Sequence, residues 1–340
     1  MTEYSDQDET DESDELFEQY SIVVDPGQEL LRIDRFLMDR APKISRSRIQ
    51  NSAKVDLLLV NEQPVKASYK VKPGDSINLM TPFEKREVEL TPENIPLKVL
   101  YEDDQLVVIN KPAGLVVHPG HGNYSGTLVN ALVYHFKNLP SANDDSRPGL
   151  VHRLDKNTTG IMVIAKTEEA LTHLAKQFFN RTTKRTYNAL VWGEPNEAGT
   201  ITGNIGRHFK NRKVMDVFPD ADFGKHAVTH YKILEKFHYV SLLECRLETG
   251  RTHQIRAHFK HIGHSLFGDV EYGGDKVLKG TTFTKYKQFV QNCFNLVPRQ
   301  ALHAKSLGFE HPTTGKEMFF ESDLPDDMVA VIEKWRAYST

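Results

Sequence analysis

Cysteine is nearly absent from this sequence: Cys245 and Cys293 are the only two in 340 residues. Two thiols far apart in the chain provide neither a disulfide framework nor a cluster of thiolate metal ligands, which is typical of proteins in a reducing compartment. No apolar run approaches the roughly eighteen residues of a membrane span. The amino terminus also lacks the basic start of a secretory signal peptide. We therefore expect a soluble, cytoplasmic protein that is not inserted into a membrane.

Positive charge is missing from the first twenty residues, which hold nine Asp and Glu and no Lys or Arg. The formal net charge of −3 therefore divides into −9 for this segment and +6 for the remainder. A segment with so much charge of one sign and so few apolar side chains cannot bury enough surface to offset the entropy of ordering. We expect residues 1–20 to form a disordered acidic tail. The rest of the chain is long enough for two or more folded domains.

Residues 21–80 are predicted to form a small α/β module. The apolar positions between Leu31 and Leu37 have the spacing of one buried helical face. Ser45 is a predicted N-cap of a second helix that runs to about Lys54, and the strand patterns DLLLVN and GDSINL follow. The basic side chains of the module are Arg32, Arg35, Arg46, Arg48, Lys54, Lys66, Lys70 and Lys72.

A larger domain is predicted over residues 97–337, after a linker over 81–96 that contains three prolines. Its strand patterns are LKVLYE, QLVVIN, GLVVH, GIMVIAK, YNALVWG, AVTHYKIL, VSLLECRLE, ALHAKSLGF and EMFFES. Its helical patterns are GTLVNALVYHF, EEALTHLAKQFF with Thr167 as a cap, and MVAVIEKW. Because strands outnumber helices and do not alternate with them, we expect an α+β fold with a mixed, mainly antiparallel sheet. The polar stretches 195–225 and 273–290 are predicted to be surface loops or insertions that face the substrate.

The most informative segment is VHRLDKNTTG, which places Asp155 between apolar Leu154 and a buried strand pattern. A structural interpretation is that this aspartate caps the turn through its own backbone, as Asp and Asn often do. A functional interpretation requires a cationic partner. A partly buried carboxylate without one loses its charge to desolvation, and a neutral acid cannot act as a nucleophile.

A cationic partner for that carboxylate is available in ETGRTHQIRAHF. Thr252 is a predicted N-cap of a helix on which Arg256 and Phe259 share a face, so that a guanidinium could reach inward with apolar support. A purely structural salt bridge would have the same sequence pattern. The residues alone leave both interpretations open.

Several other kinds of site are disfavoured by their spacing. His258, His261 and His264 do not have a standard ligand spacing, and HExxH and CxxC motifs are missing, so we expect no metal. The PGHG segment at 119–122 has neither the Lys-Ser/Thr of a P-loop nor the spacing of a dinucleotide fingerprint. A GxSxG elbow is also missing. We therefore expect no cofactor, no bound nucleotide and no serine hydrolase chemistry.

Three segments of the sequence resemble the active-site motifs of the RluA family of pseudouridine synthases. These are HRLDKNTTG (152–160), KRTYNALVWG (184–193) and TGRTHQIRAH (249–258). Supporting matches are NKPAGLVVHPG (110–120), GDVEYGG (268–274), ALHA (301–304) and HP (311–312). The module with LRIDRFL and SRSRIQ is similar to an S4 RNA-binding domain. This order of domains, with HPGHGNYSGTLVNALV and LETGRTHQIRAH, is most similar to the RluD type within the family.

The resemblance implies an enzyme that isomerises uridine to pseudouridine in RNA, without a cofactor. Asp155 would be the catalytic carboxylate, which adds to C1′ of the sugar or removes a proton from C2′. Arg256 would pair with it, and Tyr187 would stack on the uracil and stand ready for deprotonation at C5. Arg153 would fill the position that the flipped uridine vacates in the RNA. Further substrate-binding positions are His152, Thr158, Arg251 and His253.

The S4 resemblance implies that basic side chains of the module contact RNA phosphates, which set affinity without reading sequence. We expect this surface to include Arg32, Arg46, Arg48 and Lys54. The pattern departs from the family at two positions, where Asp56 and Glu62 replace glycines that flank a strand. We expect a reshaped tight turn there.

The expected partner is large-subunit (23S) ribosomal RNA or a precursor ribosomal particle, bound by a monomer. Other ribosomal sites or tRNA would fit the same motifs. A non-catalytic assembly factor that uses only the S4 module is a different class, but it gives no reason for keeping Asp155, Tyr187 and Arg256 together. A retaining glycosidase would need a second carboxylate facing the same bond, and no such residue stands out near the motifs.

Overall fold

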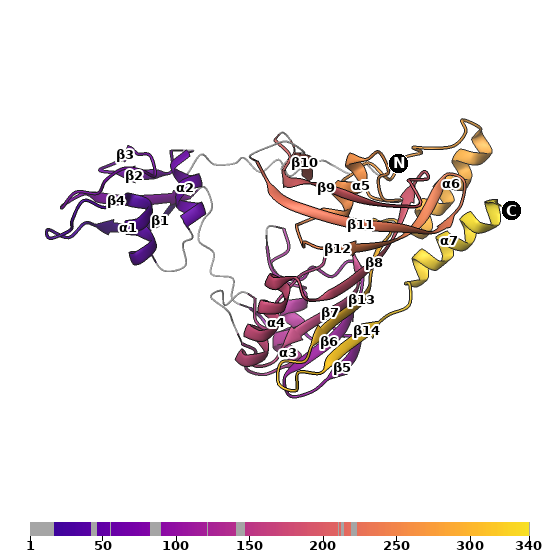
Figure 1. The fold of residues 1–340 in the computed structure, drawn as a ribbon, viewed down its shortest axis with the longest axis horizontal. Coiled ribbons are helices and arrows are strands. Elements are labelled where there is room, and N and C mark those ends of the chain that lie inside the picture. The colour runs from indigo at the N-terminus through magenta and orange to yellow at the C-terminus, as the bar shows by residue number, and fades with distance from the viewer. Residues whose placement is uncertain are drawn as a thin grey trace, which may run out of the picture. The chain divides into compact units, whose positions relative to one another are not determined.

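The computed structural model describes residues 17–41, 46–54, 56–81, 90–120, 122–140, 147–209, 211, 214–218 and 223–339. The chain divides into two compact units, Met1–Val88 and Glu89–Thr340. Each unit has its own sheet (Figure 1). Each also has its own hydrophobic core. The two units are therefore described separately.

The first unit is a four-stranded sheet with two helices. Its strands are β1 (Phe17–Val23), β2 (Leu58–Val60), β3 (Gln63–Pro64) and β4 (Ser76–Thr81), in the spatial order β1-β4-β2-β3. Its helices are α1 (Ile33–Arg40) and α2 (Arg46–Lys54). Ile33, Phe36 and Leu37 are fully buried, which confirms the helical face predicted from their spacing. Ser45, the predicted cap of α2, lies outside the described residues.

The tight turn between β2 and β3 keeps a left-handed backbone without glycine. Asn61 and Glu62 have φ of 49° and 66°, and Asp56 before the strand has φ of 58°. The replacement of family glycines at 56 and 62 therefore leaves side chains in a conformation that favours glycine. The Asn61 amide stabilises the turn by donating to Asp75 Oδ1 at 3.0 Å and by accepting from the Ser76 N–H at 2.9 Å.

The expected tail and linker differ from the described structure. Residues 1–16 lie outside the described part of the chain, whereas residues 17–20, which we placed in the tail, belong to β1 and pair with β4. The second half of the expected linker is attached to the second unit: the Gly126 N–H donates to Glu93 Oε1 at 2.8 Å. Ile95 packs against that unit's core. Composition did not reveal these contacts because the apolar segments are short and their partners lie far away in the sequence.

The second unit is built on one ten-stranded sheet. Its strands are β5 (Val99–Glu102), β6 (Leu106–Lys111), β7 (Thr159–Ala165), β8 (Lys184–Trp192), β9 (Ala198–Arg207), β10 (Met215–Phe218), β11 (Lys225–Lys236), β12 (Val240–Leu247), β13 (Leu302–Glu310) and β14 (Glu317–Glu321). The order is β10-β9-β11-β12-β8-β13-β7-β6-β5, and β14 pairs with β13. All pairs are antiparallel except β13 with β7. The predicted α+β class with a mixed, mainly antiparallel sheet is confirmed.

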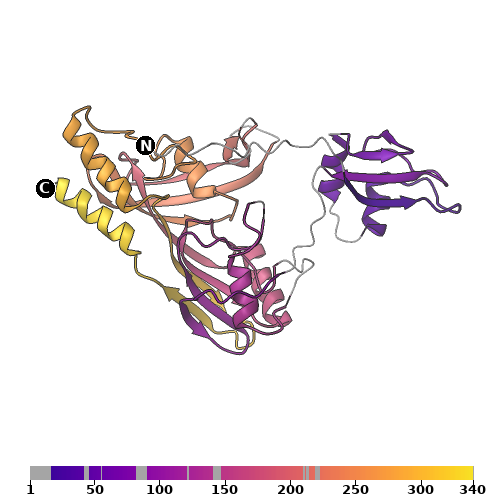
Figure 2. The same cartoon turned by 180° about the vertical axis from the view of Figure 1, so that it is seen from behind.

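Helices cover both faces of this sheet. They are α3 (Leu128–His135), α4 (Glu168–Asn180), α5 (Gln254–His261), α6 (Thr284–Leu296) and α7 (Asp326–Ser339). Leu132 of α3 and Phe259 of α5 share one core, whereas Leu174 of α4 packs on the opposite face of β6 and β7. On that opposite face α6 and α7 lie side by side, as Figure 2 shows from behind. Thr167 caps α4 by accepting from the Ala170 N–H, as predicted.

The described part of the expected loop over 195–225 contains β9 and β10, so that prediction was wrong. The glycines of this stretch suggested a loop, but here they allow close packing inside a sheet. A Cβ at Gly203 would lie 2.4 Å from Val217 Cγ1, and one at Gly199 would lie 2.7 Å from the Tyr231 hydroxyl. The glycine-rich composition of β9 therefore reflects side chains that cross over it.

Two smaller predictions in this unit were also wrong. The expected loop over 273–290 ends at α6, whose buried Tyr286, Val290 and Cys293 follow a helical spacing. The expected strand over 114–118 is a series of turns. Leu115 and Val117 are nevertheless buried, which explains why the segment has an apolar pattern.

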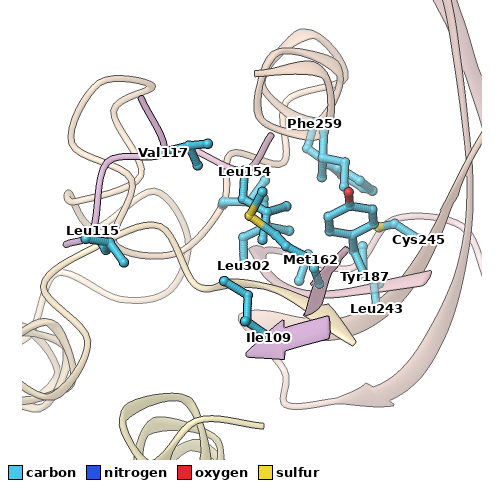
Figure 3. Close-up of a cluster of buried hydrophobic side chains, with 14 of the residues drawn as sticks. Ile109, Leu115, Val117, Leu154, Met162, Tyr187, Leu243, Cys245, Phe259 and Leu302 are labelled. Carbon is cyan, nitrogen blue, oxygen red and sulfur yellow. The ribbon is translucent and has the colours of Figure 1, made fainter. Parts of the chain in front are cut away.

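The main core of this unit lies directly under the segments that carry the motifs. Figure 3 shows Leu154, Met162, Tyr187, Phe259 and Leu302 within it. These side chains come from five separate parts of the chain. Their packing holds the ends of β7, β8, β13 and α5 together.

Candidate active site

The turn that carries Asp155 is fixed first by Lys111. The Thr158 N–H donates to the Asp155 carbonyl at 3.0 Å, and Lys111 Nζ donates to the next carbonyl, that of Lys156, also at 3.0 Å. Lys111 is fully buried and donates to two further carbonyls. Burial lowers the pKa of Lys111 to about 7, although the charge of Asp155 opposes this effect.

A second buried cation holds the same turn from the other side. Arg299 Nη1 donates to the Asn157 carbonyl at 2.9 Å, and the same guanidinium forms a bidentate pair with Asp327 of α7. Gln300 Nε2 contacts the Thr158 hydroxyl at 3.3 Å. The turn is thereby tied to segments more than 140 residues away in sequence, and its backbone carbonyls are satisfied.

The Asp155 carboxylate faces Arg256, as the functional interpretation required. Arg256 Nη1 donates to Asp155 Oδ2 at 3.3 Å, and His253 Nε2 lies 3.8 Å from Oδ1. The carboxylate is 18% exposed. Among the described residues no backbone N–H donates to it, so the capping interpretation does not describe this aspartate. It is a partly buried acid with a cationic partner and an open side.

Arg256 is shared among three carboxylates. Its Nε and Nη2 form a bidentate pair with buried Asp269 at 2.7 and 2.8 Å, and Nη2 also donates to Glu271 at 2.5 Å. Burial opposes the charge on Arg256, but the hydrogen bonds and charge of Asp269, followed by the charge of Asp155, raise its pKa. Its plane also lies 4.7 Å from the centroid of the Tyr272 ring. The guanidinium is therefore fixed in place and permanently charged.

The helix that carries Arg256 begins differently from our prediction. Its N-cap is His253, with φ of 53° and no side-chain cap bond, and Thr252 does not cap it. Gln254 organises the preceding loop instead: its Oε1 accepts from Thr249 Oγ1 at 2.7 Å and from the Arg251 N–H at 3.0 Å. A glutamine that bonds to four neighbours has no local sequence signature, so the cap rule selected the wrong residue.

His253 is connected to the edge of the sheet by a hydrogen-bonded chain. The Met215 N–H donates to the Tyr272 hydroxyl at 2.8 Å, and this hydroxyl contacts His253 Nδ1 at 3.0 Å. A hydroxyl that donates to Nδ1 leaves the proton of a neutral imidazole on Nε2, the nitrogen nearest Asp155. Burial lowers the pKa of His253, although the charge of Asp155 opposes it.

Tyr187 lines the pocket from β8. It is 9% exposed and packs with the core beneath the site. Burial raises its pKa, with the charge of Arg185 opposing and that of Asp155 reinforcing the rise. Tyr187 is therefore a neutral phenol beside the Asp155 carboxylate.

The pocket has a volume of about 240 Å³, which is slightly below the usual range for small-molecule sites. Asp155, Tyr187 and Arg256 all line it, and so do the five further residues that we expected to bind substrate: His152, Arg153, Thr158, Arg251 and His253. The predicted site residues of this unit therefore meet in one cavity.

These substrate-binding candidates differ in their exposure and in the contacts that they make within the protein. His152 is stacked on Phe178 with ring centroids 4.5 Å apart, and its Nε2 accepts from the Val163 N–H. Burial, followed by the charge of Arg185, lowers the pKa of His152 to about 3. Arg153 is exposed. Arg251 lines the pocket while its Nε donates to the His226 carbonyl at 3.2 Å.

Sequence reasoning missed several residues of this site. Asp269, Glu271 and Tyr272 belong to GDVEYGG, which was noted only as a supporting match, and Lys111 belongs to NKPAG. The argument that no acidic residue lies near the motifs was therefore wrong: two carboxylates lie beside Arg256. Both are bound to the same guanidinium, an arrangement different from two acids facing one bond.

Two of the four basic residues that we expected to contact RNA on the first unit share one ion-pair partner. Arg32 and Arg46 both pair with the fully buried carboxylate of Asp34, at 3.0 and 3.1 Å, and remain 45% and 48% exposed. The hydrogen bond from Arg32, followed by those from Arg46 and Gln50, lowers the pKa of Asp34 to about 2, against the effect of burial. Lys54 is exposed, and the Arg48 side chain lies outside the described residues.

The histidines considered as metal ligands have other partners. His258 Nδ1 is hydrogen-bonded to Thr229 Oγ1 at 2.9 Å, and His264 Nδ1 to the Trp192 carbonyl at 2.7 Å. Within the described part of the chain no group of three His, Cys, Asp or Glu side chains is placed to hold a metal ion. No helix in those same ranges is long and apolar enough to cross a membrane.

The site thus combines a carboxylate paired with one fixed guanidinium, a neutral tyrosine and a pocket of about 240 Å³ on a mixed, mainly antiparallel sheet, as expected of an RNA pseudouridine synthase. Comparison with known proteins identifies the family. The family described as RNA pseudouridylate synthase matches residues 105–261, and the S4 domain matches residues 31–77. The chain belongs to the RNA pseudouridine synthase family and is an enzyme that isomerises uridine in RNA.

Relatives match the chain over most of its length. An uncharacterized RNA pseudouridine synthase of Chlorobaculum parvum is 48% identical, over 94% of this chain and 98% of the relative. Ribosomal large subunit pseudouridine synthase D of Nitrosomonas europaea is 45% identical, over 90% of this chain and 85% of the relative. Among solved structures, human RNA pseudouridylate synthase domain containing 4 has a TM-score of 0.51 at 26% identity and covers 70% of this chain and 93% of its own.

Proposed function

We propose that this enzyme converts uridine to pseudouridine in large-subunit ribosomal RNA, as the name of its Nitrosomonas europaea relative states for that protein. The observation that carries the site assignment is the contact of Arg256 Nη1 with Asp155 Oδ2 in a pocket of about 240 Å³. The S4 module, in which Arg32 and Arg46 are half-exposed, supports the proposal that the substrate is a structured RNA.

Asp155 acts on the ribose of the flipped uridine, either by adding to C1′ or by removing a proton from C2′. Both routes break the bond between N1 and C1′ and release the uracil within the pocket, where it rotates and rejoins through C5. Arg256 orients the carboxylate through its hydrogen bond to Oδ2. Asp269 and Glu271 bind the other nitrogens of that guanidinium and hold it in place.

Tyr187 stacks on the uracil, and its neutral hydroxyl relays the proton that leaves C5: the oxygen takes that proton as its own proton passes to the Asp155 carboxylate, which has by then released the sugar. Arg153 enters the RNA stack where the uridine has left it, because a planar guanidinium can replace base contacts. Thr158, Arg251 and His253 contact the flipped nucleotide, and His152 shapes the wall behind it. In the first unit Arg32, Arg46, Arg48 and Lys54 contact phosphates. We further propose that the enzyme acts as a monomer in the cytoplasm.

The test is to map pseudouridine in ribosomal RNA from a strain without this gene, by carbodiimide-dependent stops of reverse transcription. We expect stops to disappear from specific large-subunit positions and to return with the wild-type gene. A complementing gene with Asp155→Asn should leave the stops absent. Unchanged large-subunit RNA, with stops lost from tRNA, would contradict the proposed substrate. A full set of stops in every RNA would contradict the enzymatic function itself.

A further inference from the structure

Arg185 lies in the wall of the pocket, two residues before Tyr187 on β8. Side chains two apart on a strand point to the same face, at a spacing of about 7 Å. This residue was not among the predicted site residues. Its guanidinium lies over the Phe178 ring, 5.5 Å from the centroid. It therefore shares the pocket with Tyr187 and lies on the same side of the sheet.

The Arg185 guanidinium has no anionic partner in the described structure. Its Nε is buried and makes no hydrogen bond, and no ion pair to it occurs among the described residues. Arg256, in the same cavity, instead binds three carboxylates. A half-buried guanidinium with an unused N–H is costly unless a ligand supplies the missing acceptor. The position thus has the properties of an unfilled anion site.

The backbone around Arg185 leaves room for this guanidinium. A Cβ at Gly250 would lie 3.1 Å from Arg185 Nη1. Phe178 supports the opposite side of Arg185 and is itself stacked on His152. The glycine and the aromatic ring together hold the guanidinium at the pocket wall without neutralising it.

We propose that Arg185 binds a phosphodiester group adjoining the flipped uridine, while Tyr187 contacts the base. The inference rests on the proposed site, because it places the base beside Tyr187. In a uridine whose ring lies on Tyr187, the ribose stands between the base and the phosphates. The distance from base to phosphate is comparable with the spacing between Tyr187 and Arg185, two residues apart on the strand. Guanidinium donors match phosphate oxygens in geometry and charge. Arg185 is thus a substrate-binding residue that recognises the backbone of the everted nucleotide.

The test compares Arg185→Gln with the wild type on a stem-loop RNA that the wild type modifies. We expect KM to rise about tenfold, kcat to stay within about twofold, and the slope of log affinity against log salt to fall by about 1. Arg185→Lys should recover part of the affinity. The matched control is Lys184→Gln, since Lys184 points to the opposite face and pairs with Glu317 at 3.1 Å. That control should change neither KM nor the salt slope.

Methylphosphonate linkages then identify the phosphate. With a neutral linkage placed on the 5′ or the 3′ side of the target uridine, one position should weaken the wild type and leave Arg185→Gln unaffected, so that the two effects do not add. A drop in kcat with unchanged KM, or additive effects at both linkages, would overturn the inference. No product from the wild-type enzyme on any ribosomal RNA would instead contradict the proposed function.

Discussion

At the residue scale, the site depends on how one guanidinium divides its hydrogen bonds. Arg256 gives its bidentate contacts, at 2.7 and 2.8 Å, to Asp269, and a single longer contact of 3.3 Å to Asp155. Coulomb attraction at a few ångströms is strong in a partly dry pocket. Asp269 therefore holds the cation in place, and Asp155 benefits from its charge while one oxygen remains open to substrate. Arg256 thus orients the Asp155 carboxylate and leaves one of its oxygens free to act on the substrate.

Substituting Asp155 with asparagine should abolish catalysis without unfolding the protein. The amide has nearly the same shape, and Arg256 keeps Asp269 and Glu271, so no buried charge is left unpaired. We expect product formation to fall by about 10³-fold or more, with RNA affinity nearly intact. Single-turnover assays and a filter-binding titration measure the two quantities. An equal loss of binding would show that the residue is structural.

The control at the same site is Asp269→Asn. This change removes the bidentate partner of Arg256 and should destabilise the second unit, by about 3 kcal/mol on the scale of broken buried pairs. Thermal unfolding of the two variants should therefore separate them clearly. Equal melting temperatures would contradict the assignment of Asp269 as the residue that holds the guanidinium.

The stability of the second unit should depend on pH through Lys111. Its pKa is about 7 in the folded protein against 10.5 for an ordinary lysine. Between these values the unfolded chain binds one proton more than the folded one, so the free energy of unfolding rises with pH. The slope from this group is up to about 1.4 kcal/mol per pH unit. Lys111→Met should lack this rise.

Urea unfolding between about pH 7 and pH 10 measures the effect of Lys111. Fluorescence is a suitable probe, because both tryptophans of the chain, Trp192 and Trp335, are buried in the second unit. Only the difference between wild type and Lys111→Met is assigned to Lys111, since other groups titrate in the same range. Parallel curves for the two proteins would show that the lysine has an ordinary pKa.

The residues that sequence reasoning identified are those with chemistry in a recognisable motif: Asp155, Tyr187 and Arg256. Those it missed, such as Lys111 and Arg299, act through contacts with residues far away in sequence. Arg299 binds the carbonyl of Asn157 across 142 positions. No local pattern encodes such a contact, because the partner is a backbone oxygen that every residue has.

At the element scale, the β2–β3 turn is a site of avoidable strain. Asn61 and Glu62 both have positive φ, which two-residue hairpins accommodate best as Asn-Gly. Glu62→Gly should stabilise the first unit by about 0.5–1 kcal/mol, because relief of the left-handed strain exceeds the added entropy of the unfolded chain. Glu62→Ala keeps a Cβ and should give no gain.

Hydrogen exchange of the β2 and β4 amides in the full chain measures this change, since these strands carry buried Leu58, Val60 and Ile77. Protection should increase for Glu62→Gly only. Slower exchange in both variants would trace the effect to the missing charge of the glutamate rather than to its backbone.

Elements with strong periodicity could be predicted, and elements defined by packing could not. The α4 helix and its Thr167 cap follow directly from the pattern of the sequence. By contrast, β9 is a strand because Val217 and Tyr231 cross over its glycines, and α5 begins at His253 because Gln254 ties the preceding loop to β11. In both cases tertiary contacts decide what the local sequence leaves ambiguous.

At the scale of the whole molecule, we expect the first unit to add RNA contacts to those of the second unit, which holds the candidate active site. Removing residues 1–88 should leave a folded second unit, because that unit has its own core. We expect weaker association with RNA and a salt slope lower by about 0.7–0.9 for each phosphate that the first unit no longer neutralises. Affinity measured from about 50 to 200 mM salt provides the test. A slope identical to that of the full chain would contradict a docking role for the first unit.

The placement of β13 has a consequence for synthesis of the protein. This strand lies between β7, which follows the Asp155 turn, and β8, which carries Tyr187, and it is preceded by Arg299. The pocket is thus completed by Leu302 of β13, a segment translated after all three motifs. We expect a nascent or prematurely terminated polypeptide that ends before β13 to contain all three motifs and yet to lack an assembled pocket.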